Sequence, residues 1–261
     1  MFYYDGELQE NNHIQLDINN YDWLYGATVF TTLRVYHKSL NYPLTNWQNH
    51  CDRLKSSITE FEWIMPDWER IVRESKYLLN YFSVLRITIF PDGKELIMGR
   101  ELPLNLEEKQ EKGIQGLVCL DSKIKRSLAL HKTGNYLAPY LALQQAKNQD
   151  YDEAILTDIN NNWLETSTGN LWGYKQGIWF TPDLDTGILP GIVRSMIIKN
   201  ANFPIKINHW TSEFVEDLEA IAYSNSVVEI ISFSKIKIGE KIKEYNPNHK
   251  AYSLLKKIFL V

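Results

Sequence analysis

A lysine stands in a polar cluster where an amine could do chemistry. Lys132 lies in the segment His131-Lys132-Thr133-Gly134-Asn135-Tyr136, between an apolar stretch and a predicted helix. A lysine in such a segment is most often a solvated surface residue. An amine that is partly buried or close to another cation can instead form a Schiff base with an aldehyde. The cluster alone is compatible with both interpretations.

A carboxylate, Glu165, stands at the edge of a predicted strand and precedes the segment Thr166-Ser167-Thr168-Gly169-Asn170. An isolated Glu in this setting is usually an ordinary exposed residue of a hairpin. Alternatively, Glu165 could be a carboxylate that faces a pyridine nitrogen. Such a carboxylate keeps the nitrogen protonated, so that the ring can accept electrons.

Two further features could bind an anion. Arg53 falls between the apolar positions Cys51 and Leu54 of a predicted helix, from which a guanidinium can contact a phosphate in bidentate geometry. A surface ion pair with Asp or Glu is the alternative role for this arginine. Pro190-Gly191 predicts the start of another helix, whose first backbone N–H groups and dipole favour an anion. By itself this second feature indicates only that a helix begins.

Together the clusters supply an amine, an acid and a phosphate site, which are the groups that pyridoxal 5'-phosphate requires. The sequence resembles the class IV aminotransferases, also called fold-type IV pyridoxal-phosphate enzymes. This family includes branched-chain and D-amino-acid aminotransferases and aminodeoxychorismate lyases. The matching motifs cover nearly the whole chain in the family's order: Tyr25-Gly26, Phe30-Thr31-Thr32-Leu33-Arg34, His50-x-x-Arg53-Leu54, Lys132-x-x-Asn135-Tyr136, Glu165, Asn170-Leu171, Phe180-Thr181-Pro182, Leu189-Pro190-Gly191-Ile192-Val193-Arg194 and Ser224-Asn225-Ser226.

The resemblance implies a role for each of the residues around the cofactor ring. Lys132 corresponds to the lysine that binds the cofactor covalently and then moves protons. Glu165 corresponds to the partner of the pyridine nitrogen. Tyr136 is expected near the phenolic oxygen of the ring, and Asn170 beside the ring.

The resemblance also implies a phosphate site. Arg53 corresponds to the phosphate-binding arginine. The backbone N–H groups of Ile192 and Val193 and the hydroxyl of Ser226 complete the set.

Three features favour lyase over aminotransferase chemistry within the family. The Phe30-Thr31-Thr32 sequence is similar to the Phe-Thr-Thr of lyases, where aminotransferases more often have Glu after the aromatic residue. Ser224-Asn225-Ser226 resembles the lyase form of that loop, and the chain is short, as lyases are. Against this, Pro91-Asp92 replaces the Arg-Gly pair of many lyases and D-amino-acid enzymes, and Gly26-Ala27-Thr28 replaces the usual Gly-Asp-Gly.

We therefore expect a 4-amino-4-deoxychorismate lyase that releases pyruvate and 4-aminobenzoate for folate synthesis. A D-amino-acid or branched-chain transaminase is the alternative. An inactive cofactor-binding relic or an interaction protein is a third hypothesis, which the presence of Lys132, Glu165 and Arg53 together disfavours. A dianionic substrate needs cations or hydrogen-bond donors, for which Thr32, Arg34 and Arg86 are the candidates.

The hydrophobic periodicity predicts the elements that position these residues. We expect an α/β (α+β) chain in two domains, 1–112 and 113–261, joined by the charged segment Leu102–Lys112. Helices are predicted over 46–60, 67–80, 136–147 and 249–260 and from Pro190 onward, with strands over 1–8, 29–36, 84–90, 95–98, 114–120, 153–157, 220–223 and 227–233. The resemblance implies a cofactor in the cleft between the domains and a homodimer or higher assembly.

Composition excludes several other classes of protein. The 261 residues are 44% hydrophobic and carry 28 basic against 32 acidic side chains, a net charge of −4. Without a basic stripe the chain is a poor nucleic-acid binder, and its apolar runs are too short to cross a bilayer. No signal peptide is visible at the start, and the two cysteines, Cys51 and Cys119, fit a reducing compartment. We expect a cytoplasmic protein that binds a small amine and no metal.

Overall fold

The computed structural model describes residues 1–120, 124 and 126–260. Its internal contacts divide the chain into two compact units. The first unit comprises Met1–Pro103 and His131–Asn135, and the second comprises Leu104–Leu130 and Tyr136–Val261. The segment that carries Lys132 therefore belongs to the first unit, although it follows more than twenty residues of the second.

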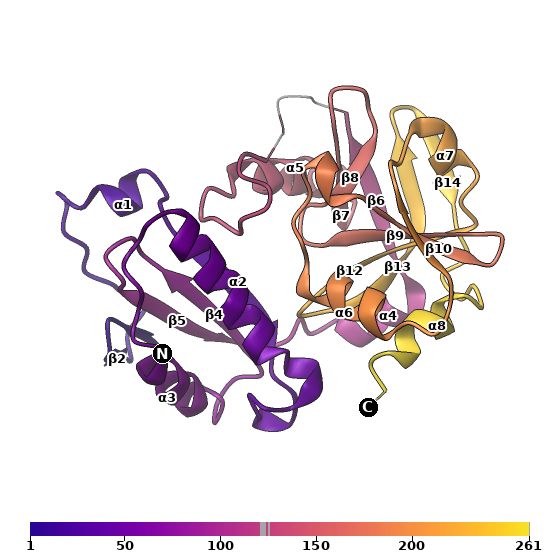
Figure 1. The fold of residues 1–261 in the computed structure, drawn as a ribbon. Coiled ribbons are helices and arrows are strands. Elements are labelled where there is room, and N and C mark those ends of the chain that lie inside the picture. The colour runs from indigo at the N-terminus through magenta and orange to yellow at the C-terminus, as the bar shows by residue number, and fades with distance from the viewer. Residues whose placement is uncertain (121–123, 125, 261) are drawn as a thin grey trace. The chain divides into compact units, whose positions relative to one another are not determined.

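The first unit is an antiparallel sheet with helices α2 and α3 on one face (Figure 1). The strand order is β2-β1-β5-β4-β3. Helix α2 packs on β3 and α3 packs on β5. The elements are β1 (Phe2–Tyr4), β2 (Glu7–Gln9), α1 (Tyr21–Leu24), β3 (Val29–Arg34), α2 (Trp47–Glu60), α3 (Trp68–Leu78), β4 (Val84–Ile89) and β5 (Glu95–Arg100).

Both predicted helices of this unit are confirmed, and their apolar spacing explains them. Cys51, Leu54 and Ile58 recur at helical spacing on α2 and are buried against the sheet. Helix α3 begins after Asp67, whose side chain accepts a hydrogen bond from the backbone N–H of Arg70 at 3.0 Å. The predicted hairpin at Pro91-Asp92-Gly93 is also confirmed, because β4 and β5 pair on either side of it.

The register of β3 assigns its side chains to the two faces of the sheet. Thr31 pairs with Ile87 of β4, and both are buried on the helix-covered face. Because side chains alternate along a strand, the neighbouring Thr32 and its partner Arg86 lie on the opposite face. The alternation therefore separates the predicted substrate residues from the side that faces α2.

The Lys132 segment lies beside β3. The backbone N–H of Phe30 donates to the carbonyl of Lys132 at 2.8 Å, and Val29 and Thr133 form an antiparallel bridge. A Cβ on Gly134 would lie 2.1 Å from Thr28 Oγ1, so this close approach requires glycine. The backbone next to Lys132 is thus fixed to the edge of the sheet.

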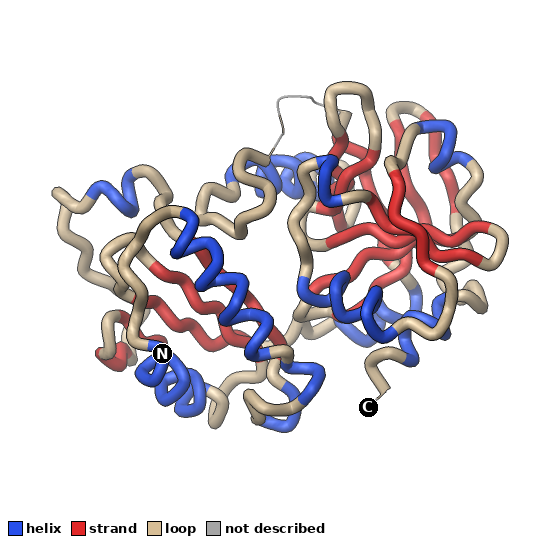
Figure 2. The backbone as a smooth tube through the Cα atoms, viewed as in Figure 1, coloured by secondary structure: helices blue, strands red, loops and turns tan. Residues whose placement is uncertain are grey.

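The second unit is built on a sheet of nine described strands that curls round on itself (Figure 2). The order is β11-β10-β9-β12-β13-β6-β7-β8, with β14 paired to β13, and β8 also pairs with β9. The strands are β6 (Ile114–Cys119), β7 (Glu153–Thr157), β8 (Trp163–Thr166), β9 (Asn170–Lys175), β10 (Ile178–Pro182), β11 (Ile205–Asn208), β12 (Ala220–Asn225), β13 (Glu229–Ile238) and β14 (Lys241–Glu244). The helices are α4 (Leu106–Lys112), α5 (Leu137–Lys147), α6 (Ile192–Asn200), α7 (Ser212–Glu216) and α8 (Tyr252–Lys257).

The segment predicted as a linker differs from the prediction. Leu106–Lys112 forms helix α4, which packs on β13 and ends at Gly113, where φ is +70°. An ion pair between Lys112 and Glu108 at 2.9 Å joins successive turns, and Leu106 is buried. Because α4 belongs to the second unit, the contacts divide the chain between Pro103 and Leu104 rather than after Lys112.

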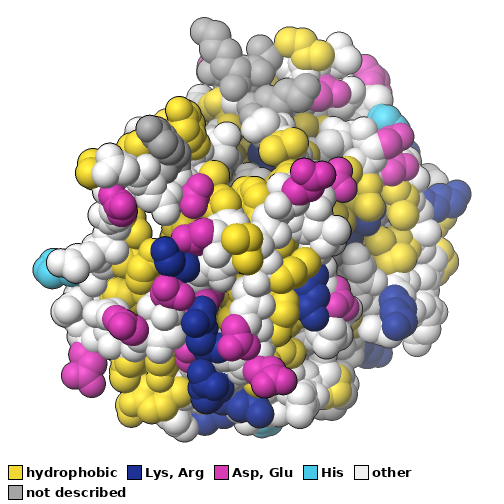
Figure 3. All heavy atoms as spheres, turned by 60° about the vertical axis from the view of Figure 1, so that its left-hand side comes forward, with side chains coloured by type: hydrophobic (Ala, Val, Ile, Leu, Met, Phe, Trp, Pro, Cys, Tyr) yellow, Lys and Arg dark blue, Asp and Glu magenta, His cyan; other side chains and the backbone are white. Residues whose placement is uncertain are grey.

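The charge distribution and hydropathy of the described residues add two observations. On the face shown in Figure 3, Lys and Arg side chains are interspersed with Asp and Glu. Across the part of the chain that the structure describes, no helix is both long and apolar enough to cross a membrane.

Candidate functional site

Lys132 lies on the first unit, with its Nζ atom 4.7 Å from the centre of the Phe30 ring. The residue before it is held to helix α2, because His131 Nδ1 is 3.0 Å from Ser57 Oγ and its ring contacts that of Phe61. The side chain of Lys132 is partly buried rather than fully solvated. This position is compatible with the covalent role that the sequence predicted for this lysine.

Arg53 projects from α2 toward β3. Its Nη2 atom donates to Thr31 Oγ1 at 2.8 Å, and Thr31 also contacts Nδ1 of His50. Burial lowers the pKa of His50 well below its ordinary value, and the charges of Arg53 and Lys132 lower it further. The charges of these two cations therefore act on the same buried imidazole.

The three predicted substrate residues lie on the same face of the sheet, because Thr32 and Arg34 are two residues apart on β3 and Arg86 pairs with Thr32. The Arg86 guanidinium lies over the Phe30 ring, with Cζ 3.7 Å from its centre, and Arg86 pairs with Thr32. The Phe30 ring is thus in contact with Arg86 and Lys132. Arg34 lies four residues after Phe30 on β3, about 13 Å away along the strand. Its guanidinium stacks on the ring of Tyr36. The structure therefore favours Arg86 and Thr32 over Arg34 as neighbours of Lys132.

Glu165 lies in the second unit and is 5% exposed, so it is not an ordinary surface residue of a hairpin. Its Oε1 atom accepts a hydrogen bond from Arg126 Nη1 at 2.6 Å, in an ion pair whose two side chains are both buried. Its Oε2 atom accepts from the backbone N–H of Leu189 at 3.2 Å. A carboxylate held by a guanidinium and a backbone donor is stabilised in its charged form.

Asn170 connects Glu165 to the beginning of α6. Its Nδ2 atom donates to Glu165 Oε2 at 3.4 Å and to the carbonyl of Leu189 at 2.9 Å. A Cβ on Gly191 would lie 1.9 Å from Asn170 Oδ1, so glycine is required there for packing. The predicted helix start is thereby refined: Gly191 is the N-cap and Ile192 is the first helical residue.

The first turn of α6 presents backbone N–H groups that the helix itself does not use. Ile192 and Val193 are its first two residues, and Gly191 provides no capping side chain. In a helix of nine residues the dipole adds a partial positive charge at this end. The first turn is therefore chemically suited to the phosphate role predicted for it.

Tyr136 and Ser226 are the two remaining predicted residues. Tyr136 donates its hydroxyl to the carbonyl of Ser167 at 3.0 Å, and the Arg126 Cζ atom is 5.7 Å from the centre of the Tyr136 ring. Ser226 lies in the turn between β12 and β13, where Asn225 Oδ1 accepts from the backbone N–H groups of Val227 and Val228.

Sequence reasoning missed Arg126 altogether and quoted His50 and Thr31 only as parts of motifs. Arg126 stands in an irregular segment in which no periodicity distinguishes it from a surface arginine. Thr31 and His50 are separated by nineteen residues and meet only through the packing of β3 on α2. Alternation along β3 could have placed Thr31 on the buried face, but not opposite His50.

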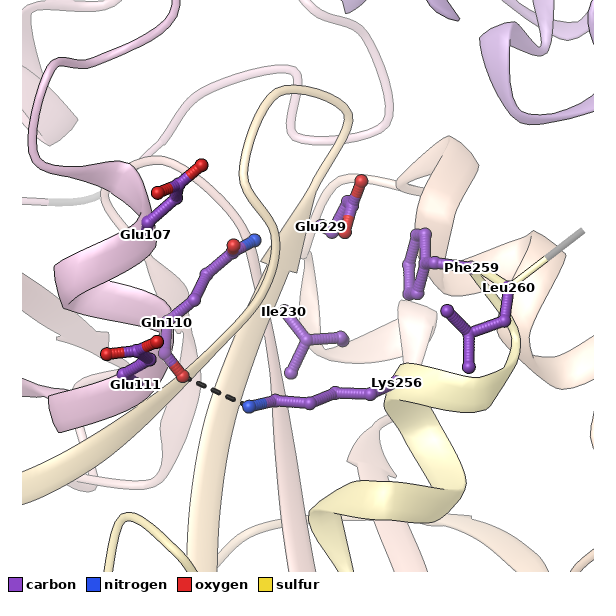
Figure 4. A pocket seen from close by; sticks show the side chains of 8 residues that line it. All are labelled: Glu107, Gln110, Glu111, Glu229, Ile230, Lys256, Phe259 and Leu260. Atoms are coloured by element: carbon purple, nitrogen blue, oxygen red, sulfur yellow. Dashed lines mark hydrogen bonds between the residues drawn. The ribbon is translucent and has the colours of Figure 1, made fainter.

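Two pockets lie in the second unit, and they differ in whether predicted site residues line them. A cavity of about 90 Å³ is lined by Arg126, Glu165, Leu164 and Gly187, among others. Figure 4 shows another pocket, of about 330 Å³, lined by Glu107, Gln110, Glu111, Glu229, Ile230, Lys256, Phe259 and Leu260. The lining of this second pocket contains none of the predicted site residues, whereas Glu165 lines the first cavity.

The residues fit pyridoxal phosphate on two observations in the second unit. Glu165 is a buried carboxylate whose donors keep it ionised, as a partner of a protonated pyridine nitrogen must be. Gly191 provides no side chain to cap the first N–H groups of α6, which leaves these groups for an anion. In the first unit, Lys132 and Arg53 supply the amine and the cation.

Comparison with known proteins identifies the family. The model of the class IV aminotransferases matches residues 28–236, most of the chain, and the protein belongs to this family. Membership indicates a pyridoxal-phosphate-dependent enzyme.

Individual relatives include both branches of the family. An aminodeoxychorismate lyase of Vibrio harveyi is 24% identical over 259 residues, covering 92% of this chain and 93% of the relative. A branched-chain-amino-acid aminotransferase of Escherichia coli is 24% identical over 226 residues, covering 76% and 72%. The fold is similar to that of a branched-chain aminotransferase from Thermoproteus uzoniensis, with a TM-score of 0.80, 19% identity and coverage of 99% and 93%.

Proposed function

We propose that this protein is a pyridoxal-phosphate-dependent 4-amino-4-deoxychorismate lyase, which releases pyruvate and 4-aminobenzoate for folate synthesis. The observation that carries the choice within the family is Thr31, a buried hydroxyl that contacts both Arg53 and His50 at the position where aminotransferases more often have Glu. The nearly end-to-end match to the Vibrio lyase, against three quarters of the chain for the Escherichia coli aminotransferase, supports the same choice.

Lys132 would hold the cofactor covalently, and Glu165 would bind its pyridine nitrogen. Arg53, the backbone N–H groups of Ile192 and Val193, and the Ser226 hydroxyl would bind its phosphate. Tyr136 and Asn170 would lie along the ring. When bound, pyridoxal phosphate supplies an electron sink for the pair left behind when the amine-bearing carbon loses its proton.

Few side chains of the protein take a direct part in this reaction. Lys132 Nζ would take the proton from the amine-bearing ring carbon of the substrate, and Glu165, held by Arg126, would supply the carboxylate that binds the ring nitrogen. Loss of the enolpyruvyl group breaks a carbon–oxygen bond and makes the product ring aromatic, so the protein mainly has to orient the substrate. Arg86 and Thr32 are proposed to bind the substrate carboxylates, with Arg34 the weaker candidate.

A transaminase of the D-amino-acid or branched-chain type is the second proposal. The observation that favours the branched-chain type is Pro91-Asp92, which forms the turn after β4 in place of the Arg-Gly pair of many lyases and D-amino-acid enzymes. An inactive cofactor-binding relic is disfavoured because Lys132, Glu165 and Arg53 are all present.

We also propose a homodimer in the cytoplasm. Leu137, Tyr140 and Leu141 recur at helical spacing on α5 and are 61%, 55% and 47% exposed, an apolar stripe that a second copy could cover. Cys51 and Cys119 are both buried, and neither forms a disulfide among the described residues, as expected in a reducing compartment.

One experiment separates the two activities. The purified protein, loaded with pyridoxal phosphate, is incubated with 4-amino-4-deoxychorismate and, separately, with D- and L-amino acids plus 2-oxoglutarate. The lyase proposal predicts 4-aminobenzoate fluorescence and an equal amount of pyruvate. Rapid transamination of an amino acid without 4-aminobenzoate would assign the protein to the aminotransferase branch.

A further inference from the structure

Three side chains of the first unit form a buried hydrogen-bond chain that ends at the predicted phosphate arginine. His50 and Arg53 are three residues apart on α2 and therefore lie on the same face of that helix. Thr31, on β3, lies between them: its hydroxyl contacts His50 Nδ1 and accepts from Arg53 Nη2 at 2.8 Å. Thr31 is 0% exposed and His50 is 1% exposed.

The chemistry of the three groups fixes the direction of this chain. A guanidinium has only donors, so the Thr31 oxygen must accept from Arg53. A hydroxyl has one proton, and the acceptor within reach for it is His50 Nδ1. Because His50 Nδ1 is the acceptor that the described contacts offer to this proton, we assign the neutral imidazole with its proton on Nε2. Burial and the charges of Arg53 and Lys132 keep the pKa of His50 well below its ordinary value, which holds the ring in this state.

The cost of this arrangement argues against a purely structural histidine. His50 Nε2 is buried and has no hydrogen-bond partner among the residues that the structure describes. A buried N–H without a partner costs about 1–3 kcal/mol, which an apolar residue at the same place would not incur. The benefit of the imidazole lies on its other side, where Nδ1 accepts the Thr31 proton and turns the lone pairs of the hydroxyl toward Arg53.

We propose that His50 is a positioning residue that acts through Thr31 to hold the Arg53 guanidinium ready for a phosphate monoester. The inference rests on the proposed function, because it takes the ligand of Arg53 to be the phosphate of the cofactor. It assigns His50 no contact with substrate or cofactor. Its effect is on the geometry of one arginine.

Matched variants test the two links of the chain. Thr31→Val removes the hydroxyl and keeps the shape, and Thr31→Ser keeps the hydroxyl. His50→Leu removes the acceptor, and His50→Asn places an amide oxygen near the position of Nδ1. For each variant, dissociation constants are measured for pyridoxal phosphate and for pyridoxal, which lacks the phosphate but retains the aldehyde for Lys132.

The expected result is a selective loss. Thr31→Val and His50→Leu weaken pyridoxal phosphate binding about tenfold, the effect of one hydrogen bond to a charged group, while pyridoxal binding changes less than about twofold. Thr31→Ser and His50→Asn recover most of the loss. Equal losses for both ligands, or no loss for either, would overturn the inference and leave the proposed function intact. A wild-type protein that does not bind pyridoxal phosphate would overturn both.

The tautomer gives a readout that is independent of the cofactor. Nitrogen NMR of the His50 ring in the cofactor-free protein should show an unprotonated Nδ1 and a protonated Nε2 from about pH 5.5 to 8, the range in which an ordinary histidine titrates. A His50 ring that protonates within this range, or that carries its proton on Nδ1, would contradict the direction of the chain.

Discussion

Glu165 lies directly opposite Asn170 in the pairing of β8 with β9, and this pair closes the ring of strands in the second unit. The Asn170 amide contacts both the Glu165 carboxylate and the carbonyl of Leu189, just before α6 begins. Since the register of a closed sheet is fixed, the position of the carboxylate relative to the first turn of α6 is fixed with it. Glu165 and the backbone N–H groups of Ile192 and Val193 thus lie on one rigid scaffold within the second unit.

Glu165→Gln should reduce turnover far more than cofactor content. The amide keeps the shape and the hydrogen bond from Leu189 but removes the negative charge at the ring nitrogen. We expect a fall in turnover of about a hundredfold, as when one electrostatic group of an active site is lost, with cofactor still bound. Turnover and the absorbance of bound cofactor measure the two effects, and an unchanged turnover would reduce Glu165 to a structural role.

Arg53→Ala should show the reverse pattern. Loss of the guanidinium removes a charge-assisted contact to the phosphate, so the affinity for the cofactor should fall first. At saturating cofactor, much of the turnover should return. Titration of the cofactor-free variant with pyridoxal phosphate measures this, and an affinity equal to that of the wild type would remove Arg53 from the phosphate site.

Arg126→Met should destabilise the fold, because it leaves Glu165 as a buried carboxylate without its guanidinium. Breaking one side of a buried ion pair costs about 3 kcal/mol of unfolding free energy. The double variant Arg126→Met/Glu165→Gln removes both charges and should recover most of that loss. Urea denaturation of the four proteins measures the coupling. Additive losses would show that the two residues do not stabilise each other.

Glu74 should make the stability of the first unit depend on pH. It is 2% exposed on α3, and burial and the charge of Glu95 raise its pKa to about 7, while Arg70 and Arg73 lower it. Tyr3, on β1, also interacts with it electrostatically. Because the pKa is higher in the folded chain than in the unfolded chain, the folded state binds more protons above the ordinary pKa of Glu. Stability should therefore fall as the pH rises from about 4.5 through about 7.

The matched control for this pH effect is Glu74→Gln. At pH 5 the variant and the wild type should have similar unfolding free energies. At pH 8 the variant should be more stable by up to about 3 kcal/mol, since one pKa unit corresponds to about 1.4 kcal/mol. A difference that stays constant between the two pH values would mean that Glu74 does not titrate in this range.

Much of the fold followed from local patterns in the sequence. The apolar spacing of Cys51, Leu54 and Ile58 was sufficient to place α2, and the turn residues 91–93 were sufficient to place the β4–β5 hairpin. Helix α4 was missed because its sequence is a charged run with only Leu106 buried, so no apolar periodicity marks it. Its helical state depends on packing against β13, about 120 residues farther along the chain.

For the site, the sequence predicted those residues that belong to recognisable motifs. Lys132, Glu165 and Arg53 were identified because their motifs occur in the family's order. The partners that give these residues their properties were not, because Arg126 and Glu165, like Thr31 and His50, meet only in the folded chain. For the same reason, Thr32, Arg34 and Arg86 could not be ranked as substrate contacts from the sequence. In the structure, Arg86 contacts the Phe30 ring, whereas Arg34 contacts the Tyr36 ring.

The covalent attachment of the cofactor to Lys132 tests the central claim most directly. The protein loaded with pyridoxal phosphate is treated with borohydride, digested and mapped by mass spectrometry, with Lys132→Ala treated in parallel. We expect the reduced phosphopyridoxyl group on Lys132. The variant should lose both the label and nearly all turnover, because attachment and proton transfer depend on the same amine. A label on another lysine, or an unlabelled protein that still turns over substrate, would contradict this claim.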